Sequence, residues 1–500
     1  MKRIFIYFIA LSFAGLMSCE LESVDYGSIN TSIFPKNAKD AEALLNGSVY
    51  SVFSIEDGYS RMFSLDNGIL IVPEMATDIA ECAWRDRAHI LNAEWSMSNM
   101  SRISSSNVTD YLKFIGTMML NVERIKAIDM DETLKAQYIA QLQCGMGFLA
   151  YLFYDYYGPV VLPTLEALQN PQEGQIFPRA TEDEMGKFIV DNLTAAASGD
   201  LLPYRYPKGD SDYGRMTKGV CHTVLMKYYM AVGQWAKAEA EGRELMKSEY
   251  GYKLMPHYKD IFTLENEQNE ETIFSIVCLH GTDLYQGWHT DIFPSDYPVD
   301  QDQKWNGYRM AWDFYHTYDK DDERLQTIVA EYTGTSGVLH NETTDRGDNS
   351  KPLYYGVLPL KYEWDSQTTG EDSQIDYIIY RYADVLTLLS EAIVRNSNSV
   401  TQEAVNLLNT VRERSLPGKG YKVSDFTGVD DFLDKLLLER GHELYWEGGT
   451  RRQDLIRHGK WETVMAQKAG HAVDSHLRRF PLPQSWIDEG KGAVEQNPGY

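Results

Sequence analysis

The most regular pattern of apolar positions lies near the C-terminal end of the chain. Four leucines recur at the spacing of one helix face: Leu433, Leu436, Leu437 and Leu444. Three glutamates spaced four residues apart share another face of the same predicted helix: Glu439, Glu443 and Glu447. Gly448 and Gly449 end this helix, and an arginine-rich second helix runs to Gly459. We predict a helical hairpin held by ion pairs between the glutamates of the first helix and the arginines of the second.

Two further stretches have the same layout of helix, short break and helix. In Gly214–Ser248 the first helix carries an apolar stripe, the break is Gly233-Gln234, and the second helix begins at Trp235. Gln374–Arg414 is the next such pair, and Val429–Gly459 is the third. A unit of this length with small residues where the helices cross is typical of a tetratricopeptide repeat. Stacked helical pairs of this kind bury a continuous core.

The segment between the repeats, residues 250–373, has a different pattern. Glu271–Leu279, E-T-I-F-S-I-V-C-L, is the best strand candidate in the chain. After it, a stretch rich in Trp, Tyr, Gly, Pro and Asp has no sustained helical stripe until about Met310. Long loops inside a helical scaffold are uncommon and are usually functional. We expect this segment to form an irregular, loop-rich binding lobe.

Length and charge limit the possible partners. A chain of 500 residues exceeds what one hydrophobic core usually supports, so two lobes or a repeat array are expected. The formal net charge of −26 argues against nucleic acid, whose phosphates would be repelled, and against direct adhesion to anionic lipid. We divide the chain into a signal peptide (1–18), an N-terminal part (19–270) and a C-terminal part that holds the aromatic insertion and the closing helical pairs (271–500).

The N-terminus predicts the compartment. A basic pair, Lys2-Arg3, precedes an apolar run from Ile4 to Leu16 that is too short to span a bilayer. The run ends in Leu16-Met17-Ser18-Cys19, which is similar to a bacterial lipobox. We predict cleavage before Cys19 and lipidation of that residue, since several acyl chains on one residue give stable anchoring. The alternative is an ordinary secretory signal with a chance cysteine. The other four cysteines are widely spaced and are expected to be buried free thiols.

The hairpin sequence resembles the C-terminal signature of the SusD/RagB family, ER-x-x-E-L-x-x-E-G-x-R-x-x-D-L-x-R-x-G. The matching positions are Glu439, Arg440, Glu443, Leu444, Glu447, Gly448, Asp454, Leu455, Arg457 and Gly459. The departures are Gly449-Thr450 before Arg451, and Arg452-Gln453 where the family usually has bulky aromatics. The ending P-L-P-Q-S-W-I and Q-N-P-G-Y also fits the family pattern, and the resemblance extends over nearly the whole chain.

The resemblance implies a fold, a location and a partner. The fold would be mostly α, a tetratricopeptide-like scaffold of about four helical pairs with an irregular binding lobe and little β-structure. The protein would be a nutrient-binding lipoprotein of the outer membrane, anchored through Cys19 and facing the cell surface. Its partner would be a SusC-like TonB-dependent transporter, on which it would sit as a lid.

No catalytic motif is present. The chain has no phosphate-binding loop, no H-E-x-x-H and no G-x-S-x-G. The chain holds 73 acidic residues, so chance pairs at glycosidase spacing are expected and carry no weight. Asp296, Asp300 and Asp302 could bind a structural calcium ion, but their spacing lacks the glycine and terminal glutamate of an EF-hand. We therefore expect no catalytic residue, no cofactor and no other metal.

Aromatic side chains in loops are the better functional candidates. Sugar rings have apolar faces that stack on Trp and Tyr, while their hydroxyls need polar partners. Two stretches of the chain combine both kinds of residue: Trp84-Arg85-Asp86-Arg87, and Tyr285-Gln286-Gly287-Trp288 with Trp305-Asn306-Gly307-Tyr308. The starch-binding member of the family uses comparable loops. The candidate ligand-binding residues are Trp84, Arg85, Tyr285, Trp288, Trp305, Asn306 and Tyr308. For each ring the alternative is packing under its own loop, as we expect for the scaffold residues Trp235, Trp446 and Trp461.

Three functions remain open at this point. The first is a non-catalytic surface protein that captures an oligosaccharide, or another nutrient, and delivers it to the transporter. The second is a surface glycoside hydrolase, which needs two carboxylates of divergent pKa in a cleft. The third is a tetratricopeptide adaptor that binds the tail of another protein in an open helical groove.

Overall fold

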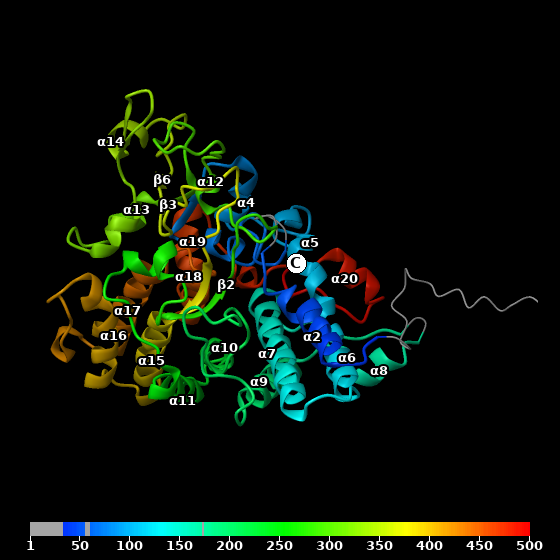
Figure 1. The fold of residues 1–500 in the computed structure, drawn as a ribbon. Helices are drawn as coiled ribbons and strands as arrows, with labels where there is room; N and C mark the ends of the chain where they lie inside the picture. Colours follow the sequence, from blue (N-terminus) through cyan, green and yellow to red (C-terminus); the bar gives the residue numbers. More distant parts are fainter. Residues whose placement is uncertain (1–33, 56–60, 173–174) are drawn as a thin grey trace, which may run out of the picture.

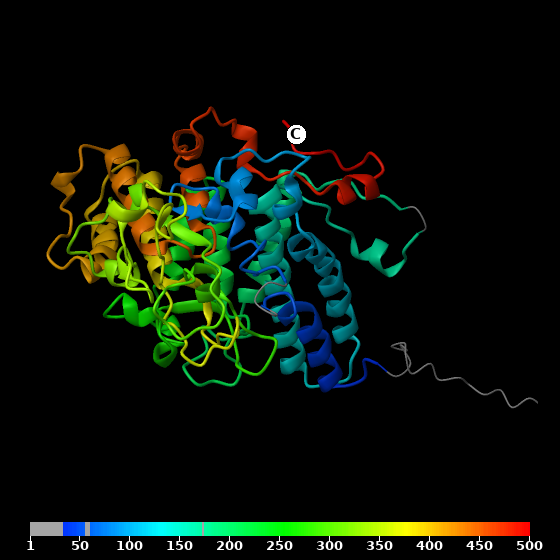
Figure 2. The same cartoon turned by 90° about the horizontal axis from the view of Figure 1, so that it is seen from above.

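In the computed structural model, residues 34–55, 61–172 and 175–500 are described. The predicted signal peptide and Cys19 lie outside these residues. Helices dominate the fold and strands are few and short, as predicted (Figure 1). The helices within residues 38–45 and 113–169 lie at one end of the molecule, together with the last helix at residues 484–489, and the helices within residues 382–444 lie at the other (Figures 1 and 2). Among the helices in the described ranges, none is both long enough and apolar enough to cross a bilayer.

Long helices form the scaffold. In chain order they are α2 (Ala38–Leu45), α6 (Lys113–Lys126), α7 (Glu132–Tyr157), α9 (Glu182–Ala197), α10 (Lys218–Ala231), α11 (Trp235–Leu245), α15 (Tyr382–Ser397), α16 (Gln402–Ser415), α17 (Val429–Leu444) and α18 (Thr450–Arg457). Consecutive helices pack together in the pairs α6–α7, α10–α11, α15–α16 and α17–α18. Helix α11 also packs against α15, which joins two pairs that are far apart in the sequence. This arrangement is the predicted stack of helical pairs.

Local signals set the helix ends. The side chains of Asp131, Thr217 and Thr401 accept a hydrogen bond from a backbone N–H of the first turn of α7, α10 and α16. Between α17 and α18, Gly448 and Gly449 have φ values of 65° and 69°, in the left-handed region that glycine enters without steric cost. The break lies in the predicted region but begins earlier: α17 ends at Leu444, because Tyr445 leaves helical geometry (ψ 137°), and Glu447 therefore lies beyond the helix.

Short helices lie in the segments between the scaffold helices and after the last of them. They are α3 (Val72–Met75), α4 (Ala88–Leu91), α5 (Ser106–Thr109), α8 (Leu165–Gln169), α12 (Trp288–Ile292), α13 (Trp312–Tyr315), α14 (Glu342–Asp345), α19 (Trp461–Ala469) and α20 (Gln484–Glu489). Three of them, α12, α13 and α14, belong to the aromatic insertion, which gathers on one side of the helical scaffold (top of Figure 1).

The strands form three small antiparallel sheets. Strand β1 (Ala80–Cys82) pairs with β3 (Tyr308–Ala311), and β3 pairs with β6 (Gly356–Val357). Strand β2 (Thr272–Ile276) confirms the predicted strand, and its partner is β7 (Tyr377–Arg381). Strands β4 (Tyr332–Thr333) and β5 (Leu339–His340) make a small hairpin. Residues 377–381 belong to the stretch predicted as a helical pair, and that prediction is wrong here because the segment pairs with β2 before α15 begins.

Buried apolar residues from the parts before and after residue 270 belong to one continuous core. Trp446 and Trp461 are buried in it as predicted, whereas Trp235 is half-buried beside the Arg395 guanidinium, which lies 4.8 Å from the centre of its ring. The four cysteines in the described part of the chain are buried and free, in agreement with the sequence.

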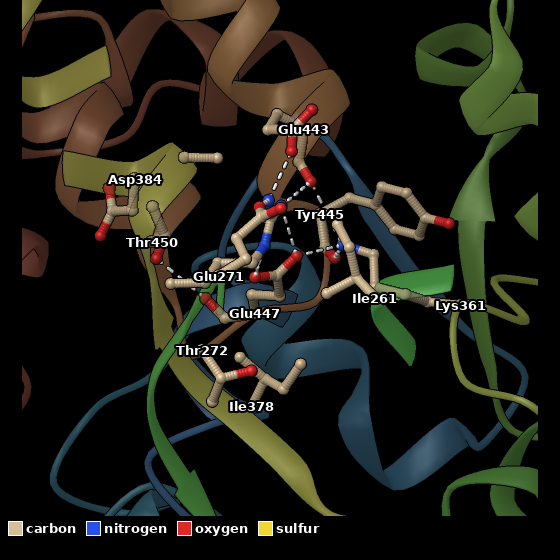
Figure 3. A network of polar contacts seen from close by, with 12 residues as sticks. Ile261, Glu271, Thr272, Lys361, Ile378, Asp384, Glu443, Tyr445, Glu447 and Thr450 are labelled. Carbon is tan, nitrogen blue, oxygen red and sulfur yellow. Dashed lines mark hydrogen bonds and ion pairs between the residues drawn. The ribbon is translucent and has the colours of Figure 1, made fainter. Parts of the chain in front are cut away.

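A buried network of charges surrounds the glutamates of α17 (Figure 3). Its cations are Arg324, Lys361, Arg381, Arg412 and Arg414, and its carboxylates are Glu271, Asp322, Glu439, Glu443 and Glu447. The guanidinium of Arg381 donates to Glu271 at 2.8 Å and to Glu447 at 2.7 Å. Burial alone would raise the pKa of Glu443, but the charges of the neighbouring arginines outweigh burial and hold its pKa well below the usual range.

The predicted pairing within the hairpin is therefore mostly wrong. Glu443 of α17 pairs with Arg381 and Arg414, which come from distant segments. In α18, Arg451 pairs with Asp78 and Arg457 pairs with Glu391. Among the ion pairs of the described residues, the one that joins the two helices directly is Arg440–Asp454, at 2.7 Å, and there the cation is on the first helix. The network fixes α17 to β2, β7 and the insertion, so it sets the position of the hairpin in the fold.

Candidate ligand-binding surface

Antiparallel pairing of β1 with β3 brings two predicted stretches together. In this pair Cys82 lies opposite Tyr308, so the residues after β1 lie beside the residues before β3. The backbone N–H of Ala83 donates to the carbonyl of Gly307 at 3.0 Å, which continues the pairing by one step. Trp84 and Trp305, which are 221 residues apart in the sequence, therefore meet just beyond the end of the β1–β3 pair.

The two tryptophans have different roles on this surface. The indole N–H of Trp84 donates to the backbone carbonyl of Trp305 at 2.9 Å, and its ring lies edge-on to Tyr308 at 5.0 Å. Gly307 packs directly under Trp84, since a Cβ there would lie 2.4 Å from the ring. Trp84 is thus held in place, while the side chain of Trp305 remains 40% exposed. An exposed indole on a fixed support is suited to stacking against an apolar ring face.

A cluster of charges lies beside Trp84. The Arg87 guanidinium lies 5.4 Å from the centre of the Trp84 ring and pairs with Asp66 and Asp86. Arg102 bridges the same two carboxylates, at 2.9 Å to Asp66 and 2.6 Å to Asp86. Arg87 is buried, whereas Arg102 and Asp86 keep about a third and a half of their side chains in solvent (34% and 49%). The accessible groups can donate to and accept from sugar hydroxyls next to the indoles.

Sequence reasoning missed Asp66, Asn67 and Arg102 as members of this cluster. Asn67 accepts from the Arg102 guanidinium at 3.2 Å and donates to Asp66 at 2.6 Å. Residues 66 and 102 stand far apart in the chain and share no motif, so nothing in the sequence placed them near Trp84. Asp86, in contrast, is two residues from Trp84 and belonged to the predicted stretch.

Two of the predicted ligand contacts are wrong. Trp288 is fully buried in α12, where its indole N–H donates to the carbonyl of Pro359 at 3.2 Å and its ring packs against Trp446 at 5.5 Å. Tyr308 is also fully buried, and its hydroxyl donates to the carbonyl of Leu65 at 2.7 Å. These two rings form the aromatic core beneath the surface because their polar atoms find partners inside the protein.

The remaining predicted residues are not decided by the structure and stay predictions. Asn306 stands between Trp305 and Gly307, is half-buried, and accepts a hydrogen bond from Arg309. Arg85 is exposed next to Trp84. Tyr285 is half-buried just before α12, where the neighbouring Gln286 forms a bridge with Ser373.

Two of the three aspartates considered for calcium have other partners. Asp296 accepts from the Tyr332 hydroxyl at 2.9 Å and lies 3.0 Å from an imidazole nitrogen of His340. Asp302 accepts from the backbone N–H of Gly370 at 2.8 Å, and Asp300 is exposed. Within the described ranges, no group of three or more His, Cys, Asp or Glu residues is arranged to hold a metal ion.

The fold and this surface define a class of protein: a helical-pair scaffold that displays indoles and charged groups on a loop-rich side. The SusD family matches residues 246–500, about half of the chain. This chain belongs to the SusD family, as its C-terminal signature indicated.

Sequence relatives agree with the family assignment. SusD-like protein P2 of Formosa agariphila is 23% identical, and the alignment covers 100% of both chains. Starch-binding protein SusD of Bacteroides thetaiotaomicron is 22% identical, with 85% of this chain and 84% of that protein covered.

Solved structures share the fold. Surface glycan-binding protein A from Bacteroides thetaiotaomicron, in complex with laminarihexaose, has a TM-score of 0.72 at 19% identity, covering 92% of this chain and 100% of that chain. A laminarin-binding SusD-like protein has a TM-score of 0.74 at 20% identity, covering 93% and 100%. At this identity the likeness shows the fold, and the ligand of this chain has to be argued from its own residues.

Proposed function

We propose that this protein is a non-catalytic, glycan-binding lipoprotein of the outer-membrane surface. It captures an oligosaccharide and delivers it to a SusC-like TonB-dependent transporter. The observation that carries the proposal is the exposed Trp305 indole beside the fixed Trp84 ring and the accessible Arg102 and Asp86 side chains. The starch-binding and laminarin-binding relatives support the same class of ligand.

Binding without catalysis fits the charges on this surface. Asp66 and Asp86, the carboxylates of the charge cluster beside Trp84, are both paired with arginines. A glycosidase needs two carboxyl groups that flank the scissile bond. Asp66 and Asp86 are instead engaged by the same two arginines, Arg87 and Arg102, and their accessible oxygens are suited to accept hydrogen bonds from sugar hydroxyls.

Titration calorimetry against a panel of neutral oligosaccharides that includes maltohexaose and laminarihexaose tests the ligand class. We expect at least one member to bind, and Trp305→Ala to weaken that binding roughly tenfold, or about 1.4 kcal/mol. Trp305→Phe, which keeps an aromatic face, should retain most of the affinity. The proposal fails if no glycan binds, or if Trp305→Ala binds as tightly as the wild type.

Two outcomes would favour the other functions. Release of shorter sugars from the bound glycan by the purified protein would establish a hydrolase. The absence of glycan binding by the wild type, combined with capture of a peptide in a helical groove, would favour the adaptor.

Anchoring and delivery are tested in cells. Cys19→Ala should abolish labelling by a radioactive fatty acid and release the protein from the membrane fraction. Affinity purification of the wild type from outer membranes should bring down a large β-barrel transporter encoded beside it. Retention of Cys19→Ala in the membrane, or the absence of any barrel, would contradict this part of the proposal.

A further inference from the structure

A pocket of about 510 Å³ lies among the N-terminal helices. Its walls come from α2, α7, the segment 200–206 and the beginning of α10 (Figure 1 labels the helices). The volume is in the range of pockets that bind small ligands. None of its lining residues belongs to the Trp84–Trp305 surface, so the two sites are separate.

The ammonium group of Lys218 faces this pocket without a hydrogen-bond partner in the described part of the chain. The residue is 6% exposed, and its nearest carboxylate oxygen, on the fully exposed Asp200, is 3.7 Å away. The ammonium lies 4.4 Å from the centre of the Tyr204 ring. An ammonium group has three N–H donors. A buried ammonium is stabilised when a ligand atom accepts a hydrogen bond from it.

The other cation of the pocket is already neutralised. Arg215 pairs with Glu42 at 2.8 Å and with Asp212 at 3.0 Å, and its guanidinium lies 5.2 Å from the centre of the Tyr50 ring. The charged groups that line the pocket are therefore two cations and three carboxylates, the third being Asp200. A ligand carboxylate placed here would meet more negative than positive charge, whereas a hydroxyl oxygen gives Lys218 an acceptor without adding charge.

Aromatic and amide groups complete the lining. The side chains of Gln137, Tyr138 and Tyr206 line the pocket, and within the described residues none of them makes a side-chain hydrogen bond to protein. Tyr204 is 36% exposed, and its ring packs edge-on against Tyr250 at 4.9 Å. Tyrosine rings offer apolar faces to a sugar ring, and the free amide and hydroxyl groups can both donate and accept.

Backbone contacts fix the pocket before any ligand binds. The N–H groups of Lys218 and Gly219 donate to the carbonyls of Pro203 and Tyr204, at 2.9 Å and 3.2 Å. These bonds hold the tyrosine-bearing segment against the start of α10. A site held in this way loses little conformational entropy when it binds.

From this lining we infer a second saccharide-binding site, which takes a neutral hexopyranose unit. The tyrosines contact the apolar face of the sugar, Lys218 donates to a hydroxyl oxygen, and Gln137 bonds a second hydroxyl. The inference extends the proposed function, because it adds a site for the same class of ligand, but it rests on residues that the first surface does not use.

Saturation-transfer NMR isolates this site in the Trp305→Ala background, where the first surface is disabled. The probes are methyl glycosides of glucose, galactose and mannose, with glucuronate as the charged comparison. We expect saturation transfer to at least one neutral glycoside, a weaker signal for glucuronate, and a roughly fivefold or greater loss on adding Tyr204→Ala or Lys218→Met. Tyr204→Phe should preserve the signal, and thermal unfolding should show that each variant is folded.

The outcomes separate the two sites. If sugars bind the wild type and Trp305→Ala alone abolishes binding, the second site is overturned and the proposed function stands. If binding survives Trp305→Ala and is lost with Tyr204→Ala, the second site is established. Three results would overturn the inference: a stronger signal for glucuronate than for the neutral glycosides, no binding of any probe, or binding that is unchanged in both the Tyr204→Ala and the Lys218→Met variants.

Discussion

Replacing Arg451 by alanine should weaken folding and leave ligand binding intact. Arg451 lies in α18 and is 6% exposed. Its guanidinium makes two parallel bonds to Asp78, at 2.8 Å and 2.7 Å, and a third to the carbonyl of Leu437 at 2.8 Å. It therefore ties the signature hairpin to the segment that leads into β1.

The expected cost follows from what the substitution leaves behind. Removing one partner of a buried ion pair typically costs about 3–5 kcal/mol, because the other charge stays buried without compensation. The side chain of Asp78 is 28% exposed, so water can partly replace the guanidinium. We therefore expect a loss of about 3 kcal/mol, at the lower end of that range. The double variant with Asp78→Ala should cost less than the sum of the single variants, with a coupling of about 2 kcal/mol.

Urea unfolding followed by tryptophan fluorescence and circular dichroism gives the free energy of unfolding, provided that the two curves coincide. Calorimetry on the folded protein gives the glycan affinity, which should stay within about twofold of wild type because β1–β3 pairing holds Trp84 independently of Arg451. The reasoning is refuted if stability changes by less than about 0.5 kcal/mol, or if the folded variant loses roughly tenfold or more in affinity.

Three further predictions use single features of the fold. Gly307→Ala places a methyl group 2.4 Å from the Trp84 ring, so it should lower glycan affinity severalfold with little change in the unfolding midpoint; equal affinity would show that the Trp84 position is unimportant. Burial lowers the pKa of His289 from 6.5 to about 4, so its stabilising contribution is complete above pH 6.5 and is lost as pH falls toward 4. Urea unfolding at pH 7 and pH 4.5 should show that His289→Gln removes about 2–3 kcal/mol of this acid-induced loss, and an unchanged pH dependence would count against it. The four buried cysteines should not react with Ellman's reagent until the protein unfolds, and rapid labelling of the native protein would contradict their burial.

The helical framework could be predicted because its signals are local. The apolar stripe of α17, the Gly448-Gly449 break and the start of α11 at Trp235 are set by residues within a few turns of each other. The resemblance of the hairpin to the SusD signature added the overall arrangement, which periodicity alone did not give.

Tertiary partners could not be predicted in the same way. Glu443 binds Arg381 and Arg414, which come from other segments, so the pattern of Glu and Arg within the hairpin suggested the wrong pairs. Similarly, aromatic residues are dense throughout the insertion, and their sequence does not say which ring faces inward. Trp288 is buried because α12 packs it against Trp446, whereas Trp305 lies in the loop before β3 and stays exposed.

A structure of the protein bound to the glycan that it binds in solution tests the central claim most directly. We predict a sugar ring stacked on the Trp305 indole, with a hydroxyl within hydrogen-bond distance of Arg102 or Asp86. A glycan bound elsewhere, with Trp305 still exposed to solvent, would contradict the account.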